Sequence, residues 1–172
     1  MDDKYYLERC VDLAKSIKDK GLDILVASII VYEDRIISKG FKRFSNGKIV
    51  HAEVDAIKKS EEMCEGAVLY TTLEPCIYIP HLEERGLIKR KGIDHKIVHS
   101  IKYSSCTDYI INSGIIKLVV GIVDPNPWIN GESLRILSNR GIEVKVIDDF
   151  REEIISLNPN YFNRRILPKD GS

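Results

Sequence analysis

The amino-acid sequence predicts an α/β fold in which mostly parallel strands are covered by helices on both faces. Short apolar, β-branched runs alternate along the chain with segments whose apolar residues recur at helical spacing. This alternation favours parallel pairing, because two consecutive parallel strands need a crossover connection, which is usually a helix. No internal repeat, low-complexity run or Pro/Ser-rich linker divides the chain, so residues 1–172 are predicted to form a single domain.

The individual elements follow from these periodicities. Strands are expected at residues 24–32, 35–41, 67–73, 115–123 and 142–147, and helices at residues 5–20, 51–62, 107–114, 132–141 and 151–165. The first two strands are separated by the turn Glu33-Asp34 and are predicted to form an antiparallel hairpin. Residues 41–50 are predicted to be a polar loop with an Asn-Gly turn.

Composition and charge favour a protein that acts on small molecules in a reducing compartment. The 26 Lys and Arg residues balance 26 Asp and Glu residues, and aromatic residues are not clustered, which argues against a polynucleotide substrate. No run approaches the roughly 18 apolar residues that a membrane span needs, and the charged N-terminus does not resemble a signal peptide. The four cysteines are irregularly spaced, which is unlike a disulfide framework, so we expect a cytoplasmic protein.

Three metal-binding side chains lie at the ends of predicted elements. His51 begins a helix, Cys76 follows a buried strand, and Cys106 precedes a short helix. A catalytic zinc ion typically has three protein ligands and an open fourth position, and imidazole and thiolate groups suit it. The sequence therefore predicts one zinc ion per chain, held by His51, Cys76 and Cys106.

Glu53 stands two residues after His51 on the same predicted helix. Side chains at positions i and i+2 diverge on a helix, so Glu53 is not expected to bind the metal beside His51. A carboxylate near the open position of a catalytic zinc ion is suited to carry protons. Glu53 is therefore the predicted catalytic acid and base.

Several segments resemble the cytidine-deaminase-like zinc superfamily, and most closely the pyrimidine deaminase domain of bacterial riboflavin biosynthesis. They are HAEVDAI (51–57), GAVLYTTLEPC (66–76), CTDYIINSGIIKLVVGIVDPNP (106–127), LSNRGIEVKV (137–146) and LNPNYFNRR (157–165). The resemblance implies a three-layer α/β/α sandwich around a mixed five-stranded sheet. It also implies His51, Cys76 and Cys106 as zinc ligands, Glu53 as acid and base, and assembly into a homodimer or homotetramer.

The chain departs from that family between its two cysteine ligands. Here 29 residues separate Cys76 from Cys106, whereas the family spacing is much shorter, so residues 77–105 are interpreted as an insertion. His81 is an alternative third ligand, but the residues after Cys106 match the family better. The insertion is basic, and Lys89 and Arg90 are candidates for binding a substrate phosphate, although a solvated surface excursion is the plainer interpretation.

The substrate pocket is predicted less closely than the metal site. Asp124 and Asn126 follow a buried strand in the turn Asp-Pro-Asn-Pro, where α/β sheets bind ligands, although such a sequence also favours a turn without any substrate. Residues 23–27 and 77–80 differ from the riboflavin branch where the pocket is expected.

Three functions remain open on these grounds. The main hypothesis is zinc-dependent hydrolytic deamination of a small amino-heterocycle, such as a pyrimidine ribotide. The alternatives are deamination of an adenine or cytosine (deoxy)nucleotide, and a catalytically silent zinc-binding module. Glu53 distinguishes them, because a structural zinc site has no use for an acid and base beside its metal and fills its fourth position with another ligand.

Overall fold

A mixed five-stranded sheet forms the centre of the protein in the computed structural model, which describes residues 2–17, 22, 24–61, 63–77, 105–127 and 129–166. The strands lie in the order β2-β1-β5-β6-β7. Their bounds are Ala27–Tyr32 for β1, Arg35–Phe41 for β2, Val68–Thr71 for β5, Lys117–Val120 for β6 and Glu143–Val146 for β7. Strand β1 is antiparallel to both β2 and β5, and β5, β6 and β7 are parallel, which confirms the mixed sheet.

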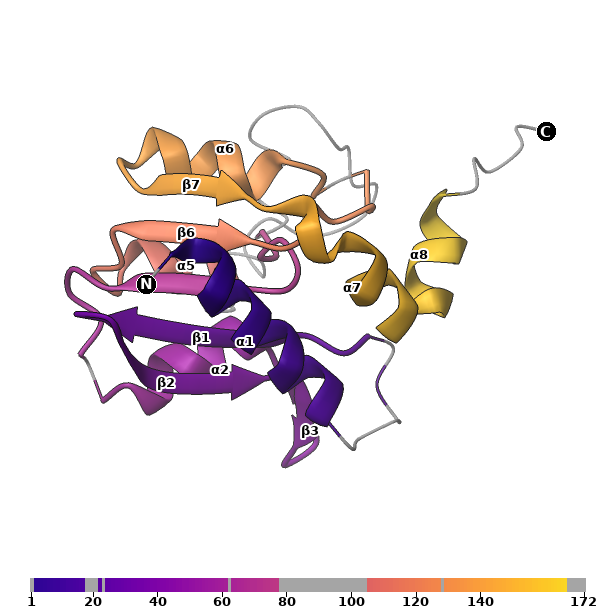
Figure 1. The fold of residues 1–172 in the computed structure, drawn as a ribbon, viewed down its shortest axis with the longest axis horizontal. Helices are drawn as coiled ribbons and strands as arrows, with labels where there is room; N and C mark the ends of the chain where they lie inside the picture. The colour runs from indigo at the N-terminus through magenta and orange to yellow at the C-terminus, as the bar shows by residue number, and fades with distance from the viewer. Residues whose placement is uncertain are drawn as a thin grey trace, which may run out of the picture.

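Helices cover both faces of this sheet (Figure 1). One face carries α1 (Asp3–Ser16) and α7 (Arg151–Leu157), which follows the short 3-10 helix Asp148–Phe150. The other face carries α2 (Ala52–Lys59), α5 (Cys106–Ile111) and α6 (Glu132–Asn139). Each face has its own cluster of buried apolar side chains, so the three-layer prediction is confirmed. Among the described residues, no helix combines the length and the apolar character that crossing a membrane requires.

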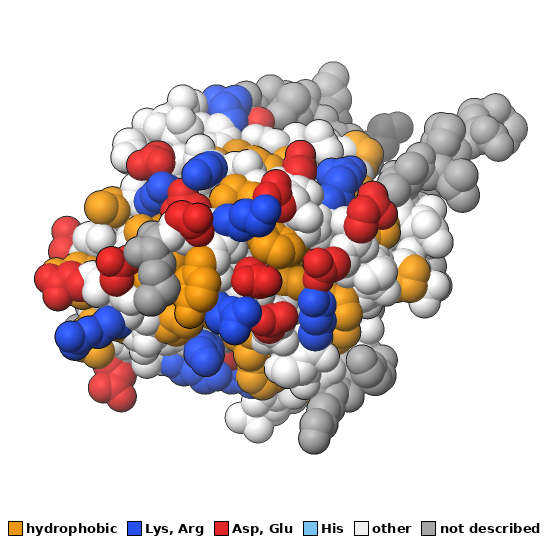
Figure 2. All heavy atoms as spheres, viewed as in Figure 1, with side chains coloured by type: hydrophobic (Ala, Val, Ile, Leu, Met, Phe, Trp, Pro, Cys, Tyr) orange, Lys and Arg blue, Asp and Glu red, His pale blue; other side chains and the backbone are white. Residues whose placement is uncertain are grey.

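Charges of both signs are interspersed on the face that α1 crosses (Figure 2). Lys4 of α1 pairs with Asp149 at 2.6 Å, and Lys15 pairs with Glu153 of α7. These exposed pairs link α1 to the C-terminal helices, although pairs of this kind contribute little stability.

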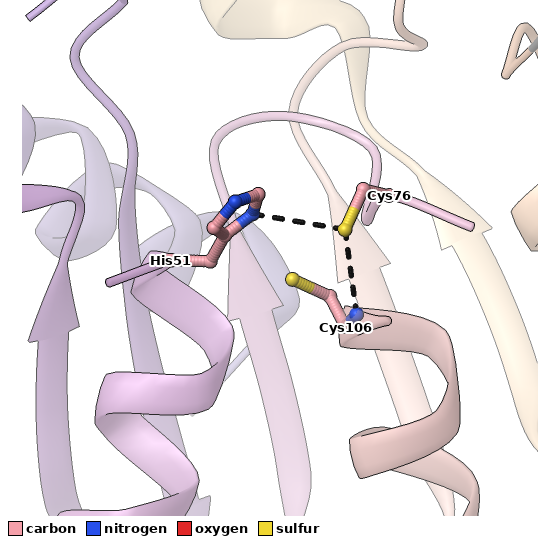
Figure 3. A group of neighbouring side chains, drawn as sticks. All are labelled: His51, Cys76 and Cys106. Carbon is pink, nitrogen blue, oxygen red and sulfur yellow. Dashed lines mark hydrogen bonds between the residues drawn. The ribbon is translucent and has the colours of Figure 1, made fainter. Parts of the chain in front are cut away.

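The carboxyl ends of the parallel strands meet at one edge of the sheet, which places the functional residues together. Helices α2 and α5 begin at this edge, and the loop after β5 and the turn after β6 leave the sheet there (Figures 1 and 3). The carboxyl edge of an open α/β sheet is where ligands usually bind.

Residues 43–50 form a hairpin, so the prediction of a polar loop at residues 41–50 is wrong. Strands β3 (Arg43–Ser45) and β4 (Lys48–Val50) pair antiparallel in a separate two-stranded sheet. Asn46 and Gly47 occupy the turn with φ values of 49° and 74°. Asn-Gly is the preferred dipeptide of such a tight turn, and the charged flanks obscured the strand pattern.

The closing helix predicted at residues 151–165 is two helices rather than one. Helix α7 ends at Leu157, and α8 spans Pro159–Ile166. Asn158 lies between them with φ −133° and ψ 43°. Proline disfavours a helical conformation in the residue before it, so Pro159 ends the first helix and begins the second.

Gly40 of β2 is the point where α2 approaches the sheet most closely. A Cβ atom at this position would lie within 3.0 Å of the backbone of Ala52 and Ala56. We expect Gly40→Ala to lower the free energy of unfolding by about 3 kcal/mol, because the helix backbone has to move. Urea denaturation measures the loss. The control is Gly47→Ala, whose Cβ meets nothing within 4 Å and which is expected to cost only about 1 kcal/mol for its positive φ. Equal losses would contradict this account of Gly40.

Candidate metal centre

His51, Cys76 and Cys106 converge at the carboxyl edge of the sheet from three separate segments (Figure 3). His51 is the N-cap residue of α2, Cys76 lies on the loop after β5, and Cys106 is the first residue of α5. Thr107 fixes the last two relative to each other, because its backbone N–H and its hydroxyl both donate to the carbonyl of Cys76, at 3.2 and 2.9 Å. Ser105 caps α5 in a capping box with Asp108, which fixes the start of that helix.

The distances between these side chains fit a single zinc ion. The Sγ atom of Cys76 lies 3.6 Å from Nδ1 of His51, and one candidate ligand atom from each of the three residues lies within 4.8 Å of the others. Zinc binds sulfur at about 2.3 Å and imidazole nitrogen at about 2.0 Å, so tetrahedral ligands lie about 3.6 Å apart. The three residues therefore form a group that is able to hold one metal ion.

The two thiols have opposite pKa shifts. Hydrogen bonds from Cys106 and His51 lower the pKa of the Cys76 thiol, and the backbone N–H of Cys106 lies 3.4 Å from its Sγ atom. The pKa of the Cys106 thiol is raised by its interaction with Cys76 and by burial, with Glu53 adding to the effect. A second thiolate in this buried group is unfavourable unless a cation is bound, so the donor set suits a divalent ion.

Glu53 lies beside this group, on the first turn of α2. Its side chain is 3% exposed, and the Sγ atom of Cys106 lies 3.4 Å from Oε2. Burial, together with the negative charge on Cys76, raises the pKa of Glu53 to about 7. A buried carboxyl group with a pKa near neutrality is able both to accept and to release a proton.

A cavity of about 220 Å³ opens onto the metal group. It is lined by Ile24, Val26, Lys42, His51, Ala52, Glu53, Leu73, Glu74, Cys76, Asp124, Asn126, Ile129 and Tyr161. Asp124 and Asn126 therefore lie where the sequence placed the pocket rim, whereas Lys89 and Arg90 lie outside the described residues. Lys42, Glu74 and Tyr161 are not predicted as site residues, because Lys42 lies outside every motif and the segments that contain Glu74 and Tyr161 gave no role to these two side chains.

Glu74 anchors the turn that follows β6. Its carboxylate accepts hydrogen bonds from the backbone N–H groups of Asp124, Gly131 and Ser133, at 2.9 to 3.2 Å, and from the Ser133 hydroxyl at 2.8 Å. The side chain is 2% exposed, and burial raises its pKa. Glu74 thereby connects the loop of Cys76 to the turn of Asp124 and Asn126.

Asp55 connects α2 to the hairpin beside the pocket. Its carboxylate accepts from the backbone N–H of Phe41 at 3.2 Å and from Lys59 at 2.8 Å, and it pairs with Arg43. Burial opposes ionisation of Asp55, but the hydrogen bonds from Arg43 and Lys59 lower its pKa overall.

We expect Asp55→Asn to lower the free energy of unfolding by about 2 kcal/mol at pH 7. Because the pKa of Asp55 is lower in the folded protein, its contribution is present above the unfolded value of 3.8 and is lost as the pH falls through the folded value. The difference between wild type and variant, measured by urea denaturation, should therefore shrink at pH 3. A difference that stays constant from pH 7 to pH 3 would contradict this role of the charge.

The fold and this group of residues together define the class of the zinc-dependent α/β deaminases. Residues 1–122 match the model of the cytidine and deoxycytidylate deaminase zinc-binding region. The chain belongs to this family, which confirms the resemblance and supports the prediction of a zinc ion.

Similar proteins come from riboflavin biosynthesis. The riboflavin biosynthesis protein RibD of Aquifex aeolicus is 36% identical over 93% of this chain and 38% of its own length. The diaminohydroxyphosphoribosylamino-pyrimidine deaminase of Buchnera aphidicola is 29% identical over 95% of this chain and 96% of its own length. The solved RibD of Acinetobacter baumannii superimposes with a TM-score of 0.70 at 28% identity, covering 95% of this chain and 40% of that chain. The chain thus spans little more than a third of the RibD proteins it matches.

Proposed function

We propose that this protein is a zinc-dependent hydrolytic deaminase of a pyrimidine ribotide. The observation that carries the proposal is the buried Glu53, which lies against a His/Cys/Cys group and lines a cavity together with His51 and Cys76. A zinc site with a purely structural role is closed by a fourth ligand and needs no adjacent acid and base.

His51, Cys76 and Cys106 would hold the zinc ion, which activates water as a nucleophile at neutral pH. Glu53 would take one proton from the attacking water at its Oε2 atom and deliver it to the ring nitrogen. It would then take the second proton from the hydroxyl group added to the ring carbon and deliver it to the amino group, which leaves as ammonia. Burial of Glu53 supports this role, because a pKa of about 7 leaves both protonation states accessible at neutral pH. Ile24, Val26, Leu73 and Ile129 give the cavity an apolar part, which would contact the reacting ring.

Two observations support a pyrimidine ribotide as the substrate. The similar proteins are named for riboflavin biosynthesis and for deamination of diaminohydroxyphosphoribosylaminopyrimidine. In addition, Lys42 and Asn126 line the cavity, and they supply a cation and an amide for the polar groups of such a substrate. We propose both as substrate contacts, together with Lys89 and Arg90 of the insertion.

The test is a comparison of substrates for the zinc-loaded full chain. We expect ammonia release from diaminohydroxyphosphoribosylaminopyrimidine with a kcat/KM at least about 100-fold above that for dCMP and AMP. A kcat/KM for dCMP or AMP that is higher than the value for diaminohydroxyphosphoribosylaminopyrimidine would assign the protein to the nucleotide deaminases. Zinc-loaded protein that releases no ammonia from any of them would favour the silent zinc-binding module.

The assembly state stays a prediction. We propose a homodimer or homotetramer, and sedimentation equilibrium of the purified chain measures it directly. A monomer at micromolar concentration would contradict this proposal without affecting the proposed chemistry.

A further inference from the structure

The turn after β6 and helix α8 both contribute side chains to the lining of the cavity. Asp124, Asn126 and Ile129 belong to the turn, and Tyr161 belongs to α8. All four line the cavity that contains His51 and Glu53. The sequence assigned Tyr161 only to a closing helix, so its place at the cavity is a new observation.

Tyr161 contacts the turn through the carboxylate of Asp124. The Tyr161 hydroxyl lies 2.8 Å from Oδ2 and 3.0 Å from Oδ1 of Asp124, to which it donates a hydrogen bond. Oδ1 of Asp124 also accepts from the backbone N–H of Asn126 at 2.8 Å. Asp124 is 3% exposed, so its carboxylate is largely shielded from water, whereas Tyr161 and Asn126 are half-buried. The carboxylate connects the hydroxyl of Tyr161 to the backbone of Asn126.

The two ends of the turn have a different anchor. Glu74 accepts from the backbone N–H groups of Asp124 and Gly131, and the side chain of Asn130 donates to the carbonyl of Asp124 at 3.0 Å. These bonds fix where the turn leaves and rejoins the core. Tyr161 instead contacts the side chain of Asp124, which accepts a hydrogen bond from the backbone N–H of Asn126.

Asn158, the residue before α8, contacts the segment before β1, which also lines the cavity. The side chain of Asn158 accepts from the backbone N–H of Leu25 at 2.6 Å and donates to its carbonyl at 3.1 Å. Leu25 stands between Ile24 and Val26, which both line the cavity. The C-terminal segment therefore contacts two segments that line the cavity and are distant from each other in sequence.

We propose that Tyr161 is a positioning residue for substrate binding, which acts through Asp124 to hold Asn126 at the cavity. The proposal rests on the proposed deaminase function. Asp124 then serves to orient Asn126 and the turn. Ordering a flexible turn costs free energy when the substrate binds. The hydroxyl of Tyr161 holds the turn in place beforehand, which reduces this cost and favours binding. The metal group and Glu53 lie on other elements, so the chemical step does not depend on it.

The test is Tyr161→Phe in the zinc-loaded full chain, which removes the hydroxyl and keeps the ring. We expect KM for diaminohydroxyphosphoribosylaminopyrimidine to rise about tenfold and kcat to change by less than about twofold. The variant lacks a hydrogen bond to a charged group, and this loss weakens substrate binding without affecting the chemical step. The control is Tyr6→Phe, which also removes a tyrosine hydroxyl bonded to an aspartate. Tyr6 bonds to Asp34 in the β1–β2 turn, at the other end of the sheet, so it should leave KM and kcat unchanged.

Hydrogen–deuterium exchange of the peptide covering residues 124–131 gives a second readout. We expect faster exchange in Tyr161→Phe and unchanged exchange in Tyr6→Phe. If wild type is active and the two variants have equal KM values, the proposal for Tyr161 is overturned and the deaminase function stands. If wild type deaminates no substrate, the proposed function fails. In that case, hydrogen–deuterium exchange of residues 124–131 decides whether Tyr161 holds the turn. An exchange rate in Tyr161→Phe equal to that of wild type overturns the proposal for Tyr161 as well.

Discussion

Replacing Glu53 by Gln is expected to lower kcat for ammonia release by about 10²- to 10⁴-fold, the contribution that a positioned acid and base usually makes. Glutamine has nearly the same shape, so the buried side chain still fills its place beside Cys106. It is unable to take up and release the proton, however. The loss should therefore appear in kcat, with KM nearly unchanged.

Zinc content makes this result specific to proton transfer. Because Glu53 is not proposed as a ligand, the variant should retain one zinc ion per chain. The matched control is Glu152→Gln, an exposed glutamate of α7, which should have the activity of wild type. A Glu53→Gln variant that is as active as wild type would exclude Glu53 as the acid and base. A variant that has lost its zinc would make it part of the metal site instead.

Replacing Cys106 by Ser is expected to lower zinc affinity by more than about 100-fold and to abolish ammonia release. Loss of a residue that only supports a ligand costs about 10- to 100-fold in affinity, so loss of a ligand itself should cost more. Serine is close in size to cysteine, but its hydroxyl does not form the thiolate that zinc prefers. Zinc per chain after dialysis against a weak chelator measures the effect.

Cys64 provides the control for this substitution. It is 1% exposed, as Cys106 is, and its Sγ atom lies 2.9 Å from the Ser60 hydroxyl. It belongs to the apolar cluster on the face of the sheet that α2, α5 and α6 cover. Cys64→Ser should therefore keep one zinc ion per chain. If Cys106→Ser also keeps its zinc and its activity, the third ligand lies elsewhere, and His81 of the insertion becomes the first alternative.

The bounds of a strand or helix are predictable from the sequence where a local residue pattern marks them. Residues 35–41 are predicted as a strand with the bounds that β2 has, because the turn Glu33-Asp34 identifies them as the hairpin partner of the preceding apolar run. The hairpin at β3 and β4 was missed, since strands of three residues give too short a pattern. The break at Asn158 was missed although Pro159 signalled it, because apolar spacing continued on both sides.

The candidate site was predictable to the extent that its residues belong to motifs. His51, Glu53 and Cys76 stand in short local patterns, and the structure brings them together with Cys106 across a long separation in sequence. Lys42, which lies between β2 and β3, and Tyr161 of α8 reach the cavity only through the tertiary fold, which no local pattern expresses. The boundaries of the insertion and the roles of Lys89 and Arg90 stay predictions.

The most direct test of the central claim is the origin of the oxygen that replaces the amino group. The zinc-loaded chain is incubated with diaminohydroxyphosphoribosylaminopyrimidine in water enriched in oxygen-18, and both ammonia and the labelled product are measured. Hydrolytic deamination predicts one labelled oxygen in the product for each ammonia released, and no reaction after zinc is removed by a chelator. Ammonia release without incorporation of the label, or release that continues without zinc, would contradict the account.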